Sequence, residues 1–165
     1  MLDNKPEISI GSRKIGSQHP VYIIAEACDN HFGSIDRAKE MIVLASESRC
    51  DAIKFQHHLP DQEMLPDVPM SGNFSEPLYE FLKRNALTIS QHAELKAYCE
   101  SLGVQYLCTP FSFQAAQELV GIGVEGLKIG SGEMTDTPSL QKMAQNFGLP
   151  MIISTGMSSY EEIDL

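Results

Sequence analysis

The chain has 165 residues, which is long enough for one domain with a real hydrophobic core. Hydrophobic residues make up 42% of the chain and charged residues 21%, a balance typical of a globular protein. No apolar run reaches about 18 residues, and the start of the chain lacks the apolar stretch of a secretory signal. We therefore expect no transmembrane helix and a cytoplasmic location.

The net charge is −10, from 12 basic and 22 acidic residues. Such an acidic chain argues against nucleic acid or an anionic membrane surface as a partner. The same overall field would repel a small anionic substrate. Any such substrate would have to be held locally, by a few well-placed lysines and backbone N–H groups.

The four cysteines, Cys28, Cys50, Cys99 and Cys108, form neither a CxxC pair nor a zinc-binding spacing. Three of them lie in apolar segments, and we expect these three to be reduced core residues. Cys28 is different because it follows a predicted strand end. It could lie near a functional site or simply pack, and the sequence leaves both readings open.

Strand and helix patterns alternate along the chain. Residues 7–16 predict a small hairpin that turns at Gly11-Ser12-Arg13. Short continuous apolar runs then predict buried strands at residues 21–25, 51–56, 104–108, 126–129 and 150–153. Capping residues before apolar stripes predict helices after Ser34, Thr88, Ser112 and Ser159, from Thr137, and over 75–82 with Pro77 in the first turn.

Two stretches depart from this alternation. Residues 57–74 carry three prolines and predict a long irregular loop, whose length favours a functional role. The last capping box, at Ser159, opens a helix shortly before the final residue, Leu165. Because a helix of one turn has little stability by itself, we expect the sequence to be cut rather than finished.

Five strand–helix alternations call for an α/β fold with a parallel sheet and right-handed crossovers. In such sheets ligands bind at the carboxyl ends of the strands. Each predicted strand has an apolar body and a polar or charged end, and we expect these ends to share one active-site face. The ends are Glu26, Lys54 with Gln56, Thr109, residues 128–133 and residues 154–156.

The fourth of these ends, Lys128-Ile-Gly-Ser-Gly-Glu133, carries the most chemistry. A lysine inside a buried strand costs several kcal/mol unless a negative group meets it. The glycines that follow let the backbone approach a ligand and offer its N–H groups. The stretch indicates a small anionic substrate beside a carboxylate, although a solvated lysine at a plain strand-to-helix turn is the alternative.

The strand ends together suggest a specific class of substrate. Two lysines, several hydroxyl groups and glycine N–H groups suit a phosphate and a carboxylate on one small molecule. The carboxylates of Glu26 and Glu133 suit binding of sugar hydroxyls and general acid–base work. Gln56 can hold a hydroxyl or an amide.

These strand-end motifs resemble those of the sialic acid synthase family. The motifs are IIAEACDNHFG, DAIKFQ, CTPF, KIGSGE and ISTGMSS, and the resemblance runs in order from about residue 7 to 163. It implies a (β/α)8 TIM barrel, of which residues 1–165 hold an N-terminal hairpin and about the first five βα units. The later strands and the C-terminal antifreeze-like domain of the family are absent from this sequence.

The resemblance also implies an activity. Family members condense phosphoenolpyruvate with an N-acetylated hexosamine, such as N-acetylmannosamine, to give a nine-carbon sialic acid and phosphate. By the resemblance, Glu26 and Gln56 would face the amino sugar, and Glu133 would handle the proton at or near the methylene carbon from phosphoenolpyruvate. Phosphoenolpyruvate itself would be held by Lys54, Thr109, Lys128, Ser131 and Ser154.

The family uses a divalent metal, Mn2+ or Mg2+, whose histidine ligands lie on later strands. The resemblance therefore implies a metal for the full-length enzyme and no metal ligand in this chain. It also implies a homodimer when full length, in which the antifreeze-like domain reaches the partner's sugar site. We expect the 165-residue chain alone to be inactive.

Two departures from the family pattern bear on the sugar site. Where the family often has Glu-Ile-Gly, this chain has Glu26-Ala-Cys28. His57 and His58 also differ from the commonest pattern, and on an extended chain they should point apart. They would either line the sugar pocket or be solvated, and the second reading is favoured. The roles of Cys28 and His31 stay open.

Two alternatives to the sialic acid reading remain. The first is an enzyme of the same family that uses the precursor of legionaminic or pseudaminic acid, since the strand motifs would be shared. The second belongs to a different class, a non-catalytic half-barrel that only binds sugar or protein, or an inactive fragment.

Overall fold

The structure is a computed structural model that describes residues 6–67, 69–70, 72 and 75–164. A small antiparallel hairpin of β1 (Glu7–Ile10) and β2 (Arg13–Gly16) precedes a parallel sheet with the strand order β3-β4-β5-β6-β7. The sheet strands are β3 (Ile24–Cys28), β4 (Ala52–His57), β5 (Gln105–Pro110), β6 (Leu127–Ile129) and β7 (Met151–Ile153).

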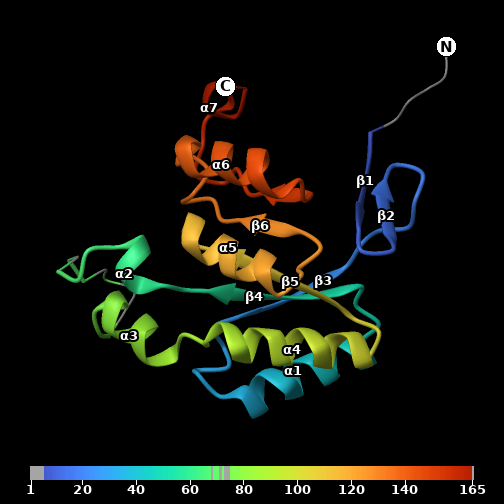
Figure 1. Ribbon diagram of the computed structural model, residues 1–165, viewed down its shortest axis with the longest axis horizontal. Coiled ribbons are helices and arrows are strands. Elements are labelled where there is room, and N and C mark those ends of the chain that lie inside the picture. The colour runs from blue at the N-terminus through green and yellow to red at the C-terminus, as the bar shows by residue number, and fades with distance from the viewer. Residues whose placement is uncertain (1–5, 68, 71, 73–74, 165) are drawn as a thin grey trace.

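Helices connect the strands and cover one side of the sheet (Figure 1). They are α1 (Ile35–Glu47), α2 (Pro60–Glu63), α3 (Leu78–Asn85), α4 (Ile89–Ser101), α5 (Phe113–Gly121), α6 (Thr137–Phe147) and α7 (Tyr160–Ile163). Each strand lies beside the one before it in the sequence, which is the order of strands in the wall of a (β/α)8 barrel. The predicted α/β fold with a parallel sheet is confirmed.

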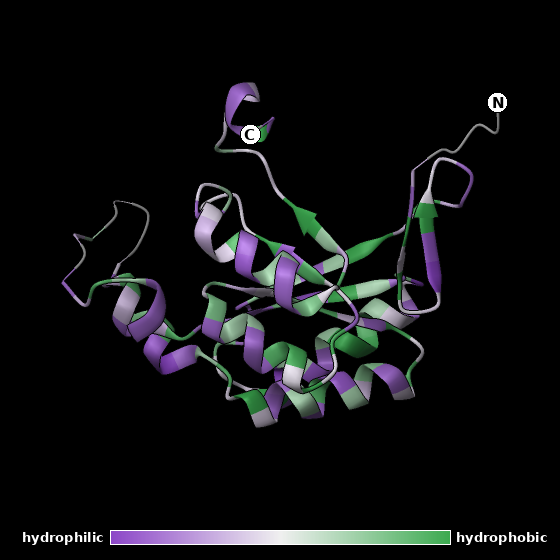
Figure 2. Ribbon diagram, turned by 45° about the horizontal axis from the view of Figure 1, so that its top comes forward, coloured by the Kyte–Doolittle hydropathy of each residue, from purple (hydrophilic) through white to green (hydrophobic). Residues whose placement is uncertain are grey.

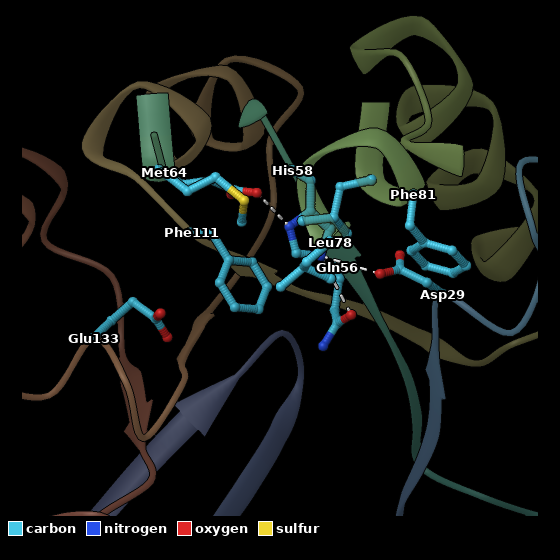
Figure 3. A pocket seen from close by; sticks show the side chains of 10 residues that line it. Asp29, Gln56, His58, Met64, Leu78, Phe81, Phe111 and Glu133 are labelled. Atoms are coloured by element: carbon cyan, nitrogen blue, oxygen red, sulfur yellow. Dashed lines mark hydrogen bonds and ion pairs between the residues drawn. The ribbon is translucent and has the colours of Figure 1, made fainter. Parts of the chain in front are cut away.

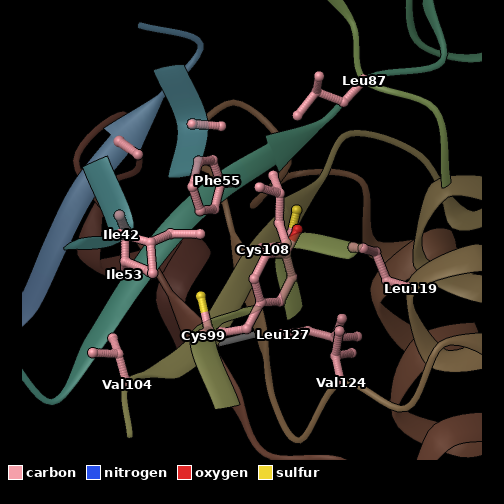
Figure 4. Close-up of a cluster of buried hydrophobic side chains, with 14 of the residues drawn as sticks. Ile42, Ile53, Phe55, Leu87, Cys99, Val104, Cys108, Leu119, Val124 and Leu127 are labelled. Carbon is pink, nitrogen blue, oxygen red and sulfur yellow. The ribbon is translucent and has the colours of Figure 1, made fainter. Parts of the chain in front are cut away.

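The main hydrophobic core lies between the sheet and its helices (Figure 4). Ile53 and Phe55 of β4 point into it, and they meet Ile42 of α1 and Leu95 of α4. Tyr106 and Phe55 stack with ring centroids 5.7 Å apart. Each fully buried side chain of this size stabilises the fold by about 1.5–3 kcal/mol, so this layer fixes the helices on the sheet.

The opposite face of the sheet has a smaller apolar cluster, in which Ile10 of the hairpin packs on Ala52 and Leu107. These contacts lie near the starts of the strands, and Arg13 forms an ion pair with Asp51 (2.8 Å) at the same end. Because side chains alternate along a strand, the residues between those of the main core must share this second face. Figure 2 shows mainly hydrophobic strands in the sheet and helices in which hydrophilic and hydrophobic residues alternate.

The predicted capping residues hold the helix starts. The hydroxyl oxygen of Ser34 accepts from the N–H of Arg37, and that of Ser112 accepts from the N–H of Ala115. Capping boxes form at Thr88 and at Ser159, as predicted. Each such cap is worth about 1 kcal/mol, since it satisfies N–H groups that the helix leaves unpaired.

The first sheet strand lies further along the chain than predicted. We expected residues 21–25, with Glu26 at the strand end, but β3 spans Ile24–Cys28 and contains Glu26. β3 is an edge of the sheet among the described residues, so Val21 and Ile23 are exposed and not buried on both faces. The apolar run alone could not show which of its residues would pair with β4.

The region between β4 and α4 also differs from its prediction. Residues 57–74 are not wholly irregular, because His57 belongs to β4 and α2 (Pro60–Glu63) follows it. The next helix, α3, begins at Leu78, and Pro77 is its N-cap residue and not part of its first turn. Within the described part of the chain, no helix is long and apolar enough to cross a membrane.

Candidate active site

Lys54 lies on the second face of the sheet, away from the helices. Its side chain is only 8% exposed and forms an ion pair with Glu26, its register partner on β3. The hydroxyl of Thr109 on β5 lies 3.5 Å from its ammonium nitrogen. A buried ammonium is costly unless it is paired, and Glu26 supplies a partner that is itself half exposed.

Lys128 of β6 faces the same side, because its neighbours Leu127 and Ile129 both point into the main core. Burial and the positive charge of Lys54 lower the pKa of Lys128, while Glu26 and Glu133 oppose this shift. The charges of Lys54, Glu26 and Glu133 thus lie close enough to Lys128 to influence its ionisation. Lys128 is half-buried, which disfavours the alternative of a freely solvated lysine.

Glu133 lies in the turn after β6, and its carboxylate folds back over Gly130. A Cβ atom on Gly130 would lie 2.0 Å from Oε2 of Glu133, so any larger residue there would displace this carboxylate. This oxygen is buried and has no hydrogen-bond partner among the described residues. Burial raises the pKa of Glu133, which makes it a better proton donor and acceptor near neutral pH.

The remaining predicted residues lie around this group. Ser131 is half-buried in the same turn as Glu133. Ser154 is half-buried just after β7, and its backbone N–H donates to the carbonyl of Ile129 (3.1 Å). Gln56 pairs in register with Thr109. The strand order therefore brings the predicted residues to one face and one end of the sheet.

A cavity of about 350 Å3 adjoins this end of the sheet (Figure 3). Its polar lining comes from Asp29, Gln56, His58, Glu63 and Glu133, and its apolar lining from Met64, Leu78, Phe81, Leu82 and Phe111. A second cavity of about 480 Å3 shares Glu63, Phe111 and Glu133 with the first. The size of each cavity suits a small metabolite.

His58 stands at the centre of the first cavity's polar lining. Nδ1 lies 2.9 Å from Oε1 of Glu63, and Nε2 lies 3.1 Å from Oδ2 of Asp29. The ring stacks on Phe111, with centroids 4.2 Å apart. Burial by itself would lower the pKa of His58, but the hydrogen bonds to Asp29 and Glu63 outweigh it and raise the pKa to about 9.

The favoured prediction that His57 and His58 are solvated is wrong. Their side chains are 1% and 6% exposed, and they do point apart as expected. His57 turns to the helix side, where Nε2 lies 2.9 Å from Oε2 of Glu118 on α5. Its ring meets that of His92 edge to face at 4.6 Å. Burial lowers the pKa of His57, so only His58 is held as a cation.

The sequence reasoning missed Asp29 and Glu63. Asp29 follows β3 directly, and its type and place at a strand end could have marked it. Glu63 lies in the region predicted as irregular, and nothing in the local pattern indicated a short helix that turns it toward His58. Glu63 is therefore recognisable only once the chain has folded.

The two residues whose roles were left open prove to be largely structural. His31 is fully buried, accepts from the N–H of Gly33 at 3.0 Å and packs against Phe55. Cys28 closes β3 with φ 47°, and burial, followed by Glu26, raises the pKa of its thiol to about 11. Such a thiol is a poor nucleophile at neutral pH. All four cysteines are free. Of the three expected in the core, Cys99 and Cys108 are buried and Cys50 is partly buried against it.

The described residues do not fit a divalent metal. No group of three or more histidine, cysteine, aspartate or glutamate side chains among them is arranged to hold an ion. In the cluster of Asp29, His58 and Glu63, both ring nitrogens face carboxylate oxygens, as in a protonated imidazolium that cannot also bind a cation.

Comparisons with known proteins show which family the chain belongs to. The chain is 38% identical over 159 residues to N,N'-diacetyllegionaminic acid synthase of Legionella pneumophila, a match that covers 93% of this chain and 44% of that protein. It is 33% identical over 154 residues to human N-acetylneuraminate-9-phosphate synthase, covering 90% of this chain and 43% of that protein. The chain thus spans less than half the length of these curated relatives.

Solved structures place the fold among barrel enzymes. The N-acetylneuraminic acid synthetase of Leptospira borgpetersenii, solved in complex with citrate, matches with a TM-score of 0.81 and 32% identity, over 97% of this chain and 53% of that one. A 3-deoxy-D-arabino-heptulosonate 7-phosphate synthase of Thermotoga maritima matches with a TM-score of 0.68 at 16% identity, which supports the fold alone. The NeuB family model matches residues 41–165. The chain therefore belongs to the NeuB family, whose members among its relatives are synthases of sialic acid and related sugar acids.

Proposed function

We propose that these residues form the first part of a synthase that condenses phosphoenolpyruvate with an N-acetylated hexosamine, of which N-acetylmannosamine is the model substrate. The products are a nine-carbon sialic acid and phosphate. The observation that carries the proposal is the position of Lys54 and Lys128 on one face of the sheet, near the carboxylate of Glu133. Two cations beside a protonatable carboxylate suit a doubly acidic three-carbon substrate and a reaction that moves a proton.

The assignment divides the site between two substrates. Lys54 and Lys128 would bind the anionic oxygens of phosphoenolpyruvate, and hydroxyl groups would complete the binding. Those hydroxyls belong to Thr109, Ser131 and Ser154. Glu26 and Gln56 would face the amino sugar, next to the cavity that Gln56 and Glu133 line.

The proposed chemistry is the one that the family resemblance implies. The methylene carbon of phosphoenolpyruvate attacks the aldehyde carbon of the open-chain sugar, a new C–C bond forms as the C=C and C=O π bonds open, and the aldehyde oxygen takes up a proton. Water then adds to the former enol carbon and loses a proton, the C–O bond to phosphate breaks, and phosphate leaves. The lysines stabilise the anionic oxygens throughout. Glu133, with its raised pKa, would exchange the proton at or near the methylene carbon, and the carboxylates would oppose the positive charge that develops beside it.

The proposal extends to the whole enzyme. It includes a divalent metal, Mn2+ or Mg2+, held by residues outside this chain, because the described residues do not fit one. The metal would supply Lewis-acid activation of the aldehyde. It also includes a homodimer with an antifreeze-like C-terminal domain, and a cytoplasmic location.

A legionaminic acid synthase is the second candidate. The match at 38% identity to a protein of that name favours it. Both candidates use phosphoenolpyruvate, so the amino sugar decides between them. Turnover of the intact synthase with a panel of N-acetylated hexosamines, including a diacetylated one, would separate the two.

Phosphoenolpyruvate binding tests the proposal. We expect Lys128→Ala to abolish measurable binding in titration calorimetry, because one of the two cations is lost. Lys142→Ala, which removes an exposed lysine of α6, is the matched control and should bind normally. If Lys128→Ala binds phosphoenolpyruvate with unchanged affinity, Lys128 does not belong to the site. The proposal would then lose its central support.

A further inference from the structure

The charges around the site are divided between two regions. Both lysines of the proposed site lie on the second face of the sheet, with Lys54 already paired to Glu26. The two cavities at the strand ends have only acidic groups and one histidine as ionisable lining. The acids are Asp29, Glu63, Glu133 and Asp136. Among the described residues that line these cavities, none is a lysine or an arginine.

The one cation in the cavity lining is not free to bind an anion. His58 donates from both ring nitrogens, to Asp29 and to Glu63, so its charge is already offset by two carboxylates. The three side chains together carry a net negative charge. Phe111 also covers one face of the ring, with the centroids 4.2 Å apart.

The same cluster fixes the orientation of Gln56. An imidazolium has only N–H donors, so the Gln56 atom that faces it must be the amide oxygen, and Oε1 lies 3.4 Å from Nε2 of His58. The amide NH2 group then points away from His58, as Figure 3 shows. Gln56 therefore offers a donor to an uncharged acceptor such as a carbonyl or hydroxyl oxygen.

The carboxylate of Glu63 is a further buried group that a ligand could contact. The side chain of Glu63 is 4% exposed, and it lines both cavities. Its Oε1 accepts from His58, but Oε2 is buried without a hydrogen-bond partner among the described residues. Such an orphan oxygen is destabilising, and a sugar hydroxyl could satisfy it. Leu78, Phe81 and Phe111 provide an apolar wall for a methyl group.

We propose that the buried cluster of Asp29, His58 and Glu63 is the specificity element of this site, which admits an uncharged N-acylated sugar and excludes the corresponding sugar phosphate. His58 is a positioning residue in this account, since it acts through Gln56. The inference rests on the proposed function, and it names the class of sugar that the function would use.

The test compares two sugars in the intact synthase, N-acetylmannosamine and its 6-phosphate. We expect kcat/KM to favour the uncharged sugar by about 100-fold or more, because like charges brought together at a binding surface cost several kcal/mol. Glu63→Gln keeps the acceptor for His58 and removes one charge, and it should narrow this ratio about tenfold. Met64→Lys adds a cation to the cavity wall without touching the cluster, and it should narrow the ratio as well.

Glu47→Gln is the matched control, because it makes the same charge change at the exposed end of α1. It should leave the ratio unchanged. Equal or better use of the 6-phosphate by the wild type would overturn the specificity and leave the proposed function standing. If neither Glu63→Gln nor Met64→Lys alters the ratio of kcat/KM between the two sugars, the cluster is not the specificity element. Absence of turnover with every amino sugar tested would overturn the proposed function itself.

Discussion

The carboxylate of Glu133 occupies the space that a side chain on Gly130 would need. A Cβ there would lie 2.0 Å from Oε2, so the carboxylate of Glu133 would have to swing away from its buried position to make room. The glycine is thus favoured by its neighbour three residues later and not by its own backbone angles, since its φ is not in the left-handed region.

Gly130→Ala should displace Glu133 and lower the kcat of the intact synthase. We expect a loss of about 10–100-fold, because a displacement of about 1 Å at a reacting group can have an effect of this size. Gly121→Ala is the matched control, since a Cβ at this exposed end of α5 meets no atom within 4 Å and lines neither cavity. Equal activity of the two variants would show that the position of Glu133 does not matter for the reaction.

Glu133→Gln tests the role of the carboxylate itself. The amide keeps the shape of the side chain but cannot exchange a proton, so phosphoenolpyruvate binding should persist while kcat falls by about 100-fold or more. Calorimetry measures the first and initial rates the second. Full activity in this variant would end the acid–base assignment.

The His58 cluster should make the fold sensitive to alkali. The pKa of His58 is about 9 in the folded chain, against about 6.5 for an unperturbed histidine. The folded state therefore keeps a proton that the unfolded state releases, so this stabilisation is complete below pH 6.5 and is lost as pH rises to about 9. The free energy of unfolding should fall by on the order of 3 kcal/mol over this range of pH.

Urea unfolding of the 165-residue chain at pH 6, 7.5 and 9.5 measures this loss. The free energy of unfolding should fall over the range in the wild type and much less in His58→Gln, whose side chain does not titrate. Parallel pH profiles for the two proteins would contradict the assignment of a charged His58.

His92 should produce the opposite dependence on the acid side. It is fully buried, its Nδ1 lies 2.6 Å from the hydroxyl of Tyr106, and burial lowers its pKa to about 3. Below pH 6.5 the unfolded chain binds a proton that the folded chain does not, so stability falls as pH drops, by on the order of 3 kcal/mol at pH 4. Unfolding at pH 4 and pH 7 should show a smaller difference in His92→Gln than in the wild type. An equal difference would mean that His92 is not held neutral.

The isolated 165-residue chain should release no inorganic phosphate from phosphoenolpyruvate, even with N-acetylmannosamine and Mn2+ present. Among the described residues, β3 and β7 are sheet edges without a second neighbour, and such edges pair with other chains. We therefore also expect its elution volume in size-exclusion chromatography to decrease with concentration. Phosphate release that depends on both sugar and Mn2+ would disprove the first expectation.

Local patterns in the sequence predicted the parallel sheet, most helix starts and the shared face of Lys54 and Gln56. These features depend on the spacing of neighbouring residues, such as the period of two along a strand. The resemblance to a known family added proposed roles for the site residues, which remain predictions. The boundaries of β3 depended on which residues pair with β4, and a short apolar run does not contain that information.

The buried histidines show what local patterns cannot predict. Two adjacent histidines after a strand look like solvated loop residues until their partners are known. His57 is buried because Glu118, 61 residues later, supplies an acceptor, and His58 is buried because Asp29 and Glu63 do so from either side. Each histidine is buried favourably only because a residue distant from it in the sequence pairs with its ring. Its burial can therefore be recognised only in the folded chain.

The hairpin that packs Ile10 against Ala52 and Leu107 lies at a suitable end of the molecule for attaching a label. It lies at the strand starts, whereas the proposed ligands belong at the strand ends, about 20 Å away along a six-residue strand. A fluorophore or affinity tag fused ahead of Pro6 would therefore stand clear of the reaction. Labelled protein could be immobilised through that end, with the catalytic side left facing the bulk solution.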